Sequence, residues 1–502
     1  MAHIRIVDLP CGYGKSLRIL RSFDKRQKYI AVVPYLSEVD RFIKDAYARS
    51  GFCLTQPVAG TTHKRDHCEK LILAGKSIAC THALFYRLGT LATRPTEEIA
   101  EVQFNGKDAP IIRTKHILDD YNLIIDEVVN PFESEKTVRP VDFEEDYVGL
   151  GMAIVHKDGR VEPTELWDKR YAQDNRTFNP SLYEKAKSGA LYKLSEGLFI
   201  LTIPMELLLK PKTVTIYTYL SEGSVLLQFL RRLKEQQPDA FTLEVEKLDP
   251  ASEAEWRADV AQALTVKSIP DLEPVKWNYT AQLKDIKTHK QCASVGHALK
   301  KLGNTELRGV KKNTVMLTCA RALWFKSKSR EKPVAGKLAK HTRLFGRPLC
   351  SETYNEEHGT FVKEWSTDGV RFVPNTTRGT NDHIKCATAL YLYDQHPEPQ
   401  LVTFLGMKRN SPEGLRFADA YALTELIQWL FRSAIRRDGI NGTGRAYRPR
   451  SKVTVYIPSA RMRNLLQNWL ATGKVSSATP RAKTAMDAAR RSKPGFGKLE
   501  AA

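Results

Sequence analysis

Long apolar runs, paired cysteine motifs and an amino-terminal leader pattern are all missing from this chain of 502 residues. No stretch approaches the ~20 apolar residues that span a bilayer. The chain goes directly into a strand-like run, Ile4–Leu9, rather than a basic and then apolar segment. The eight cysteines form no C-x-x-C pair. These absences predict a soluble, cytoplasmic protein with reduced, mostly buried thiols and no membrane partner.

Acidic residues are the scarcer charged class, with 57 Asp and Glu against 78 Lys and Arg, a net charge of +21. This excess predicts a polyanionic partner, because phosphate neutralisation and counterion release drive such binding. Lys326–Arg347 holds eight basic residues and only Glu331 as an acid. The end of the chain, from Gly473, has a single aromatic residue and predicts a disordered basic tail at 471–502. A solvated tail without a partner is the alternative.

A glycine loop follows the first apolar run. Pro10–Ser16 reads PCGYGKS and precedes a helical pattern, so the order is strand, glycine loop, Lys-Ser and helix. This order is typical of loops that hold nucleotide phosphates. The full G-x-x-x-x-G-K-[ST] pattern would place glycine where this chain has Leu9. A plain glycine turn with a solvated lysine is therefore the alternative.

The residues of this loop have distinct expected roles. Gly12 and Gly14 let the loop curl, so that its backbone N–H groups point inward. Lys15 would place a charge on the β- and γ-phosphates of ATP, and Ser16 would offer its hydroxyl to Mg²⁺.

Two adjacent carboxylates end another apolar strand, in the run Tyr121–Glu127. In a phosphate-binding α/β domain, the strand next to the loop delivers an acidic group to the Mg²⁺ shell. Asp126 would serve the metal, and Glu127 would polarise the attacking water. The alternative is a charged strand end that leads into a turn at Asn130 and Pro131.

The first ~240 residues alternate in the α/β manner. Helical patterns lie between the strands, as at Tyr35–Arg49 and Val225–Lys234, and 131–196 breaks the rhythm like an insertion. Residues 236–283 contain four prolines and predict an interdomain connection. The expected strands are Ile4–Leu9, Tyr29–Val33, Ser77–Cys80, Leu123–Asp126, Leu198–Thr202 and Thr213–Tyr219.

A second α/β unit follows. Its expected strands are Thr314–Thr318, Gly369–Val373, Thr388–Tyr391, Leu401–Phe404 and Val453–Ile457, and its expected helices are Gln291–Lys301, Asp419–Arg436 and Ser459–Leu470. This unit has no glycine-lysine loop of its own.

Arginines of this second unit are candidates for closing over a bound nucleotide, where they would stabilise charge on the γ-phosphoryl group. Arg432 and Arg436 are four residues apart on the expected helix and share a face, with Gln428 one turn before. A solvated basic face is the alternative. The apolar residues between them favour a buried helix, whose arginines need partners.

These motifs together resemble the superfamily 2 helicases, the DEAD/DEAH-like group, and especially divergent bacteriophage members, over Ile4 to about Leu470. In this resemblance, Pro34, Thr81 and His82 would contact the nucleic-acid backbone. Thr218 would lie in the motif that couples hydrolysis to strand movement.

The motifs of the second half are more degenerate. Arg378 and Gly379 resemble the pair that touches both strand and γ-phosphate, and Thr380 would contact nucleic acid. Gln428 and Arg432 keep the spacing of the last motif, but its second arginine falls one residue late, at Arg436.

The resemblance implies two RecA-like (P-loop NTPase) domains with parallel sheets, at 1–245 and 246–470, with the insertion in the first domain. It implies an ATP- and Mg²⁺-dependent helicase or translocase, acting on DNA in phage replication or recombination together with replication proteins. A terminase-like phage DNA-packaging motor ATPase, or a non-catalytic basic DNA-binding scaffold, remain the alternatives.

Overall fold

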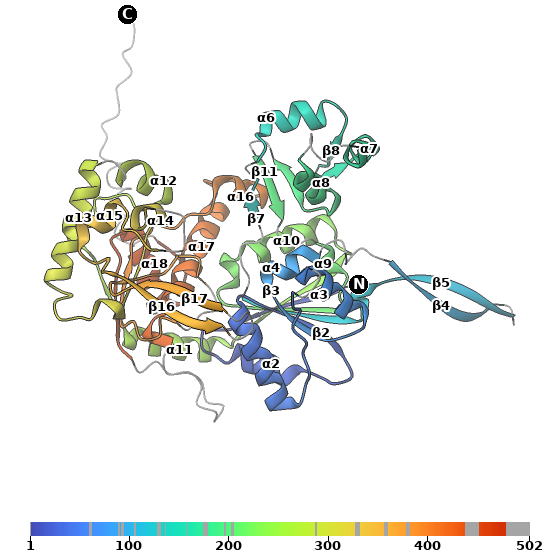
Figure 1. Cartoon of the computed structure of the whole chain (residues 1–502), viewed down its shortest axis with the longest axis horizontal. Helices are drawn as coiled ribbons and strands as arrows, with labels where there is room; N and C mark the ends of the chain where they lie inside the picture. The colour runs from blue at the N-terminus through green and yellow to red at the C-terminus, as the bar shows by residue number, and fades with distance from the viewer. Residues whose placement is uncertain are drawn as a thin grey trace, which may run out of the picture.

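The chain forms two α/β domains, each built on a parallel sheet (Figure 1). The expected α/β fold class with a parallel sheet in each domain is confirmed. No helix in the described part of the chain has the length and apolarity needed to cross a membrane. This computed structural model describes residues 2–59, 63–88, 91, 95–104, 107–127, 132–135, 137–157, 159–173, 179–194, 197–201, 205–286, 289–326, 332–355, 360–377, 382–436 and 451–477.

The first sheet has six strands, and every neighbouring pair is parallel. The order is β13 (Phe241–Lys247), β1 (Ala2–Asp8), β12 (Thr213–Thr218), β6 (Tyr121–Asp126), β2 (Lys28–Val33) and β3 (Ile78–Thr81). Strand β12 therefore lies between β1, which leads into the glycine loop, and β6, which carries the acids. The expectation that β1 and β6 are neighbours is wrong, because one strand lies between them.

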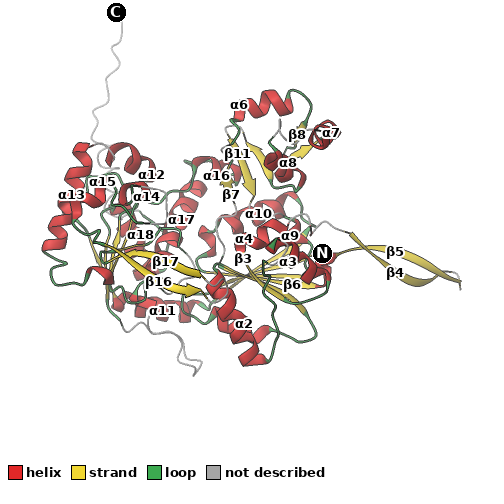
Figure 2. Ribbon diagram, viewed as in Figure 1, coloured by secondary structure: helices red, strands yellow, loops and turns green. Residues whose placement is uncertain are grey.

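Apolar helices cover both faces of this sheet, because its strands are buried almost continuously and must be shielded on each side (Figure 2). The helices are α1 (Lys15–Ser22), α2 (Leu36–Ser50), α3 (Lys64–Leu73), α4 (His82–Phe85), α9 (Glu206–Leu209) and α10 (Val225–Gln236).

Two segments are inserted into the first domain. A long antiparallel hairpin projects from it, as Figure 1 shows. A small separate unit follows β6, and it takes up the predicted strand Leu198–Thr202, which pairs there antiparallel rather than in the main sheet. The hairpin is β4 (Pro95–Phe104) and β5 (Lys107–His116), and the unit holds β7 (Phe132–Ser134), α6 (Pro140–Phe143), β8 (Ala153–Val155), β9 (Val161–Pro163), α7 (Glu165–Gln173), α8 (Pro180–Lys187), β10 (Leu191–Leu194) and β11 (Gly197–Leu201).

The second sheet has five parallel strands. Their order is β14 (Leu264–Lys267), β20 (Val453–Tyr456), β19 (Thr388–Tyr391), β15 (Val315–Thr318) and β18 (Arg371–Phe372). An antiparallel ribbon, β16 (Pro348–Asn355) with β17 (Thr360–Thr367), is inserted before β18. The helices are α11 (Pro250–Ala263), α12 (Tyr279–Ala281), α13 (His289–Asn304), α14 (Arg321–Trp324), α15 (Lys337–Thr342), α16 (Pro399–Phe404), α17 (Pro412–Leu430) and α18 (Ala460–Thr472).

One expectation for the second half is wrong. The predicted strand Leu401–Phe404 is helix α16, which begins with Pro399 at its first position. The predicted connection at 236–283 contains β13 of the first sheet, α11 and β14 of the second sheet. Domain boundaries at 245/246 and 470/471 and the insertion limits 131–196 stay predictions. The basic tail from 478 lies outside the described residues.

Helix α16 anchors the second half of the chain on the first domain. The ring of Phe404 lies 4.5 Å from that of Phe132 and 5.7 Å from that of Phe229, centroid to centroid. The guanidinium of Arg232 lies over the same ring, 5.5 Å from its centre. Aromatic contacts of this kind fix the two halves together away from the glycine loop.

Candidate nucleotide-binding site

The glycine loop has the backbone that a phosphate cradle requires. Gly12 and Gly14 have φ angles of 83° and 79°, a region that side chains with a Cβ rarely adopt. Gly14 is the residue that precedes α1, so the helix begins at Lys15 with its free N–H groups facing the loop. Lys15 and Ser16 are only half-buried. This combination of helix N-terminus, lysine and hydroxyl suits ATP phosphates and Mg²⁺.

Lys15 is aimed across the carboxyl edge of the sheet. Its Nζ donates to the carbonyl oxygens of Leu9 and Thr218, each at 3.3 Å. Leu9 N–H also donates to the Thr218 carbonyl, at 3.1 Å. The end of β12 therefore holds the lysine at the edge that also carries the acids of β6.

Glu127 stands at this edge in a strained conformation. Its φ of 56° is left-handed, which is costly for a residue with a Cβ. Its N–H donates to the carbonyl of Tyr217 at 3.0 Å, and Tyr217 lies opposite Asp126 in the parallel register. The extended backbone of β6 therefore ends at Asp126, and Glu127 begins a different backbone conformation.

Arg432 reaches this carboxylate from the second domain. Its Nη2 lies 2.9 Å from both Oε1 and Oε2 of Glu127, and the two side chains are 1% and 12% exposed. Nε and Nη1 of Arg432 are buried and have no hydrogen-bond partner among the described residues. Two buried donors therefore remain for an anion beside Glu127.

The charges around this edge set its protonation. Burial opposes the charge on Glu127, but Arg432, Lys15 and Arg436 hold its pKa well below the ordinary value. Burial and the charge of Glu127 raise the pKa of Asp126 to about 6, although Lys15 and Arg436 act in the opposite direction. A carboxylate that is destabilised in this way gains from a nearby cation, which suits the predicted Mg²⁺ ligand.

The helical placement of the two arginines is wrong in detail. Helix α17 ends at Leu430, Arg432 lies in the turn beyond it, and Arg436 ends a short 3₁₀ turn, Ala434–Arg436. They do not share a helical face, yet both act electrostatically on Glu127.

Gln428 contacts the loop after β12. Its Nε2 donates to the carbonyl of Tyr219 at 3.3 Å, and its side chain is buried. Thr424, one turn earlier, donates to the carbonyl of Leu220 at 3.0 Å. Leu220 has a left-handed φ of 53°. The structure thus gives Gln428 a place in the joint between the two domains, and its catalytic role stays a prediction.

The same loop is tied to the start of the glycine loop. Oδ2 of Asp8 accepts hydrogen bonds from Ser221 N at 2.9 Å and Ser221 Oγ at 2.6 Å. Gly223 packs so closely on α17 that an added Cβ would lie 2.3 Å from the carbonyl oxygen of Ala420. Asp8, Ser221 and Thr424 were not predicted from the sequence, because no local motif marks these polar residues.

Two of the predicted nucleic-acid contacts are buried. His82 is 4% exposed, and its Nε2 lies 3.1 Å from the carbonyl oxygen of Asp126. Burial lowers the pKa of His82 to about 4, so this ring is neutral at physiological pH. Thr218 is also buried. In this arrangement both side chains support the carboxyl edge of the sheet. The expected contact of His82 with nucleic acid and the coupling role of Thr218 stay predictions.

The remaining predicted contacts divide into two groups. Pro34, after β2, and Thr81, at the end of β3, are half-buried at the same carboxyl edge. Thr81 Oγ1 accepts from Leu84 N at 3.4 Å and caps α4. Arg378, Gly379 and Thr380 lie outside the described residues.

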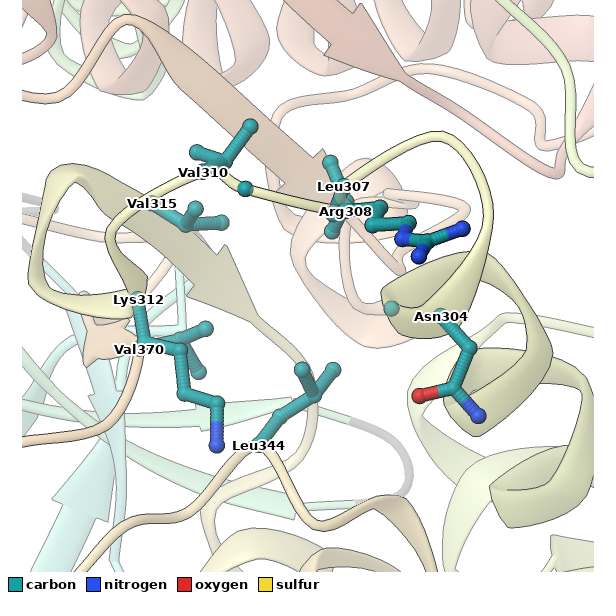
Figure 3. A pocket seen from close by; sticks show the side chains of 10 residues that line it. Asn304, Leu307, Arg308, Val310, Lys312, Val315, Leu344 and Val370 are labelled. Atoms are coloured by element: carbon teal, nitrogen blue, oxygen red, sulfur yellow. The ribbon is translucent and has the colours of Figure 1, made fainter.

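Two cavities of the described structure differ in their position relative to this site. One of about 180 Å³ lies at the domain junction and is lined by residues that include Asp8, Pro10, Tyr219 and Thr424. A larger one, of about 420 Å³, lies near the start of β15, with Arg308 and Lys312 beside apolar side chains (Figure 3). It belongs to the second domain alone and does not contain the predicted nucleotide ligands.

Comparison with known proteins gives a relative along most of the chain. Residues 276–470 match a family described as the YonV C-terminal Rossmann-like domain. The chain is 24% identical over 492 residues to the SPbeta prophage-derived uncharacterized protein YonV of Bacillus subtilis (strain 168), an alignment that covers 94% of this chain and 99% of that protein.

Solved structures with a similar course of the chain include XPD and Mss116p. An apo structure of XPD has a TM-score of 0.45 and 14% identity, covering 91% of this chain and 92% of that one. Mss116p, named a DEAD-box helicase, has a TM-score of 0.33 and 11% identity in a structure with single-stranded RNA and AMP-PNP, covering 95% of this chain and 70% of that one.

Proposed function

We propose that this chain is an ATPase that uses hydrolysis to move along or unwind nucleic acid, with ATP held between its two domains. The observation that carries the proposal is the contact of Arg432 with Glu127, which joins the second domain to the acid-bearing edge of the first at 2.9 Å. A DNA substrate, a role in phage replication or recombination and action in the host cytoplasm are the finer parts of this proposal.

The residues of the first domain bind and orient the nucleotide. Lys15 and the N–H groups of the glycine loop hold the phosphates, while Ser16 and Asp126 provide oxygen ligands for Mg²⁺. The metal would neutralise phosphate charge when bound at those oxygens. Glu127 stays ionised because its pKa is depressed, so its oxygens can accept hydrogen bonds from the attacking water and orient it.

Arg432 has two functions in this proposal. While it bonds both oxygens of Glu127, that carboxylate is held by the arginine and is not free to orient water. The γ-phosphate would compete for the guanidinium, whose Nε and Nη1 have no partner among the residues the structure describes. Arginine would then stabilise phosphoryl charge, and Glu127 would be released to act on water.

Movement would follow from the joint between the domains. Thr424, Gln428 and Arg432 are spaced four residues apart, and all three reach across to the first domain. A shift of Arg432 would therefore also move the loop at Tyr219–Leu220, which is hydrogen-bonded to Asp8 through Ser221. If the affinity of each domain for a nucleic-acid strand rises and falls in turn, this shift would become directed motion along the strand.

The test is the rate of ATP hydrolysis by the full chain, alone and with single-stranded DNA, duplex DNA and RNA. The proposal predicts slow basal hydrolysis and stimulation by nucleic acid. Strong stimulation by duplex DNA alone would favour the packaging-motor alternative. Nucleic-acid binding without any hydrolysis would favour the scaffold alternative and contradict the proposal.

A further inference from the structure

The β16–β17 ribbon of the second domain has two faces of different chemistry. In its antiparallel register, Trp365 lies opposite Cys350 and Lys363 lies opposite Glu352, and alternate residues along a strand share a face. Phe361, Lys363 and Trp365 are therefore in line on one face. Leu349 is on the other face, opposite Ser366.

Aromatic and basic side chains alternate along the first of these faces. Phe361 is 68% exposed, which is unusual for a large apolar side chain, and Trp365 is half-buried. The Nζ of Lys332 lies 5.6 Å from the centre of the Trp365 ring. Lys363 is exposed and makes an ion pair of 2.9 Å with Glu352. The face thus offers flat rings with cations beside them.

The base of the ribbon is braced against the body of the domain. Arg347 and Asp368 pair across it, and Asp368 N–H donates to the Arg347 carbonyl at 3.1 Å. Gly346 has a φ of 78°, and an added Cβ on Gly369 would lie 2.0 Å from the carbonyl oxygen of Phe345. Only glycines allow this close crossing, so the ribbon leaves the domain in a fixed direction.

We propose that this face is a stacking platform for single-stranded nucleic acid, an inference that rests on the proposed function. Alternate residues on a strand are ~6.6 Å apart, a spacing at which successive bases of an extended strand can meet successive rings or cations. Bases stack on Phe361 and Trp365, and Lys332 and Lys363 lie near the backbone phosphates.

The basic side chains near this face favour nucleic acid as its ligand. Lys332 belongs to the basic segment Lys326–Arg347, which the nucleotide site does not use and which leads directly into β16. In Figure 1 the ribbon extends from the second domain toward the first. A strand held at the carboxyl edges of the sheets could therefore continue onto it. Duplex bases are already stacked on one another, so the platform should favour single strands.

Binding of a fluorescein-labelled oligothymidylate and of a labelled duplex, measured by anisotropy with the full chain, tests the platform. Phe361→Ala and Trp365→Ala should each weaken single-strand binding about ten-fold, because each removes a stacking surface, and should change duplex binding little. Trp365→Phe should restore most of the affinity. Leu349→Ala is the matched control, an exposed apolar side chain on the opposite face, and should bind like the parent.

The two exposed cysteines provide a second readout that needs no loss of affinity. Cys350 lies on the platform, opposite Trp365, and Cys53 lies in the first domain, while the other six thiols are buried. Bound oligothymidylate should slow the alkylation of Cys350 by a maleimide and leave that of Cys53 unchanged, as followed by mass spectrometry.

The outcomes separate this inference from the proposed function. If the parent binds oligothymidylate but Phe361→Ala and Trp365→Ala bind it equally well, and Cys350 is not protected, the platform is overturned while the proposed function stands. If the parent binds no nucleic acid, the proposed function fails and the platform fails with it.

Discussion

Two arginines of the second domain, Arg432 and Arg461, differ in how far their donors are satisfied. Arg461 uses all three of its nitrogens, bonding Asp394 at 2.8 Å, Asp419 at 2.9 Å and the carbonyls of Gln395 and Ala418. Arg432 uses one nitrogen, toward Glu127 of the other domain, and is more deeply buried, at 1% against 21% exposure of the side chain.

This difference separates a structural arginine from one that awaits a ligand. A buried donor without a partner is costly, so it persists where a bound group satisfies it. Arg461 closes a network between α17 and α18, and Asp419 also accepts from Ser477. Its network is complete within the second domain. Arg432 crosses between domains and keeps two donors unpaired within the described structure.

The largest effect is expected at the phosphate loop. Lys15→Ala should abolish nucleotide binding, a loss on the order of 10³ in affinity, because the phosphates lose their fixed charge. Titration with a fluorescent ATP analogue measures it, with Lys44→Ala, an exposed lysine on α2, as the control. Undiminished binding by Lys15→Ala would show that the loop is a plain glycine turn.

Glu127 is the first-domain partner of Arg432, and Glu127→Gln should affect ATP hydrolysis without affecting ATP binding. ATP binding should persist, while hydrolysis falls by about 10²–10⁴, because the amide has only one oxygen with which to accept hydrogen bonds from the water. Steady-state phosphate release measures the effect. Glu244→Gln is the control, since Glu244 is exposed on the edge strand β13 of the same sheet, where it pairs with His3. Equal turnover by Glu127→Gln and the parent would rule out its role.

Arg461→Ala should act on stability instead of chemistry. Removing it leaves Asp394 and Asp419 partly buried without their cation, which should cost about 3 kcal/mol in the free energy of unfolding. Urea denaturation measures this, and Arg416→Ala, at an exposed position of α17, should be near neutral. If Arg461→Ala lowered hydrolysis and left stability unchanged, the contrast between the two arginines would be lost.

The raised pKa of Asp126 predicts that Mg²⁺ binding depends on pH. Its pKa of about 6 means that it is protonated below that pH, so Mg²⁺ affinity should fall about ten-fold per pH unit there and level off above it. Since the folded-state pKa is raised, the contribution of Asp126 to stability decreases as pH rises from its ordinary pKa to about 6. Calorimetric titration of Mg²⁺ with nucleotide checks this, and Asp126→Asn should remove the dependence. A flat profile in the parent would exclude Asp126 as a ligand.

The smallest effect is expected at the joint. Thr424→Val keeps the shape of the side chain but removes the donor to the Leu220 carbonyl, which should cost about 1 kcal/mol. Hydrolysis stimulated by nucleic acid should fall about five-fold, while basal hydrolysis is unchanged. Loss of basal and stimulated rates together would place Thr424 in the site itself rather than in the joint.

Local patterns predicted the central strands of the first domain and its glycine loop. The strands β1, β2, β6 and β12 and the loop Pro10–Ser16 follow from apolar runs that end in glycine or acid, signals within a few residues of one another. Asp126 and Glu127 were found in the same way. The left-handed φ of Glu127 was not predictable, because nothing in the local sequence requires it.

Longer-range structure was predicted less well, for physical reasons. Short apolar runs do not distinguish strand from helix, so Leu401–Phe404 was assigned wrongly, although Pro399 is a helix-start signal. Helix α17 ends at Leu430 without a glycine or proline to mark it. The bond of Asp8 to Ser221 joins residues 213 positions apart, which only the fold brings together.

The most direct test of the account is stimulated ATP hydrolysis by Arg432→Ala, measured beside its ATP binding, with circular dichroism to confirm folding. The account predicts near-parental ATP binding and a fall in nucleic-acid-stimulated hydrolysis of about 10³–10⁵, the usual effect of removing an arginine that stabilises phosphoryl transfer. Hydrolysis at the parental rate would show that the second domain supplies no catalytic arginine from this position, and would contradict the proposal that the two domains share one ATP site.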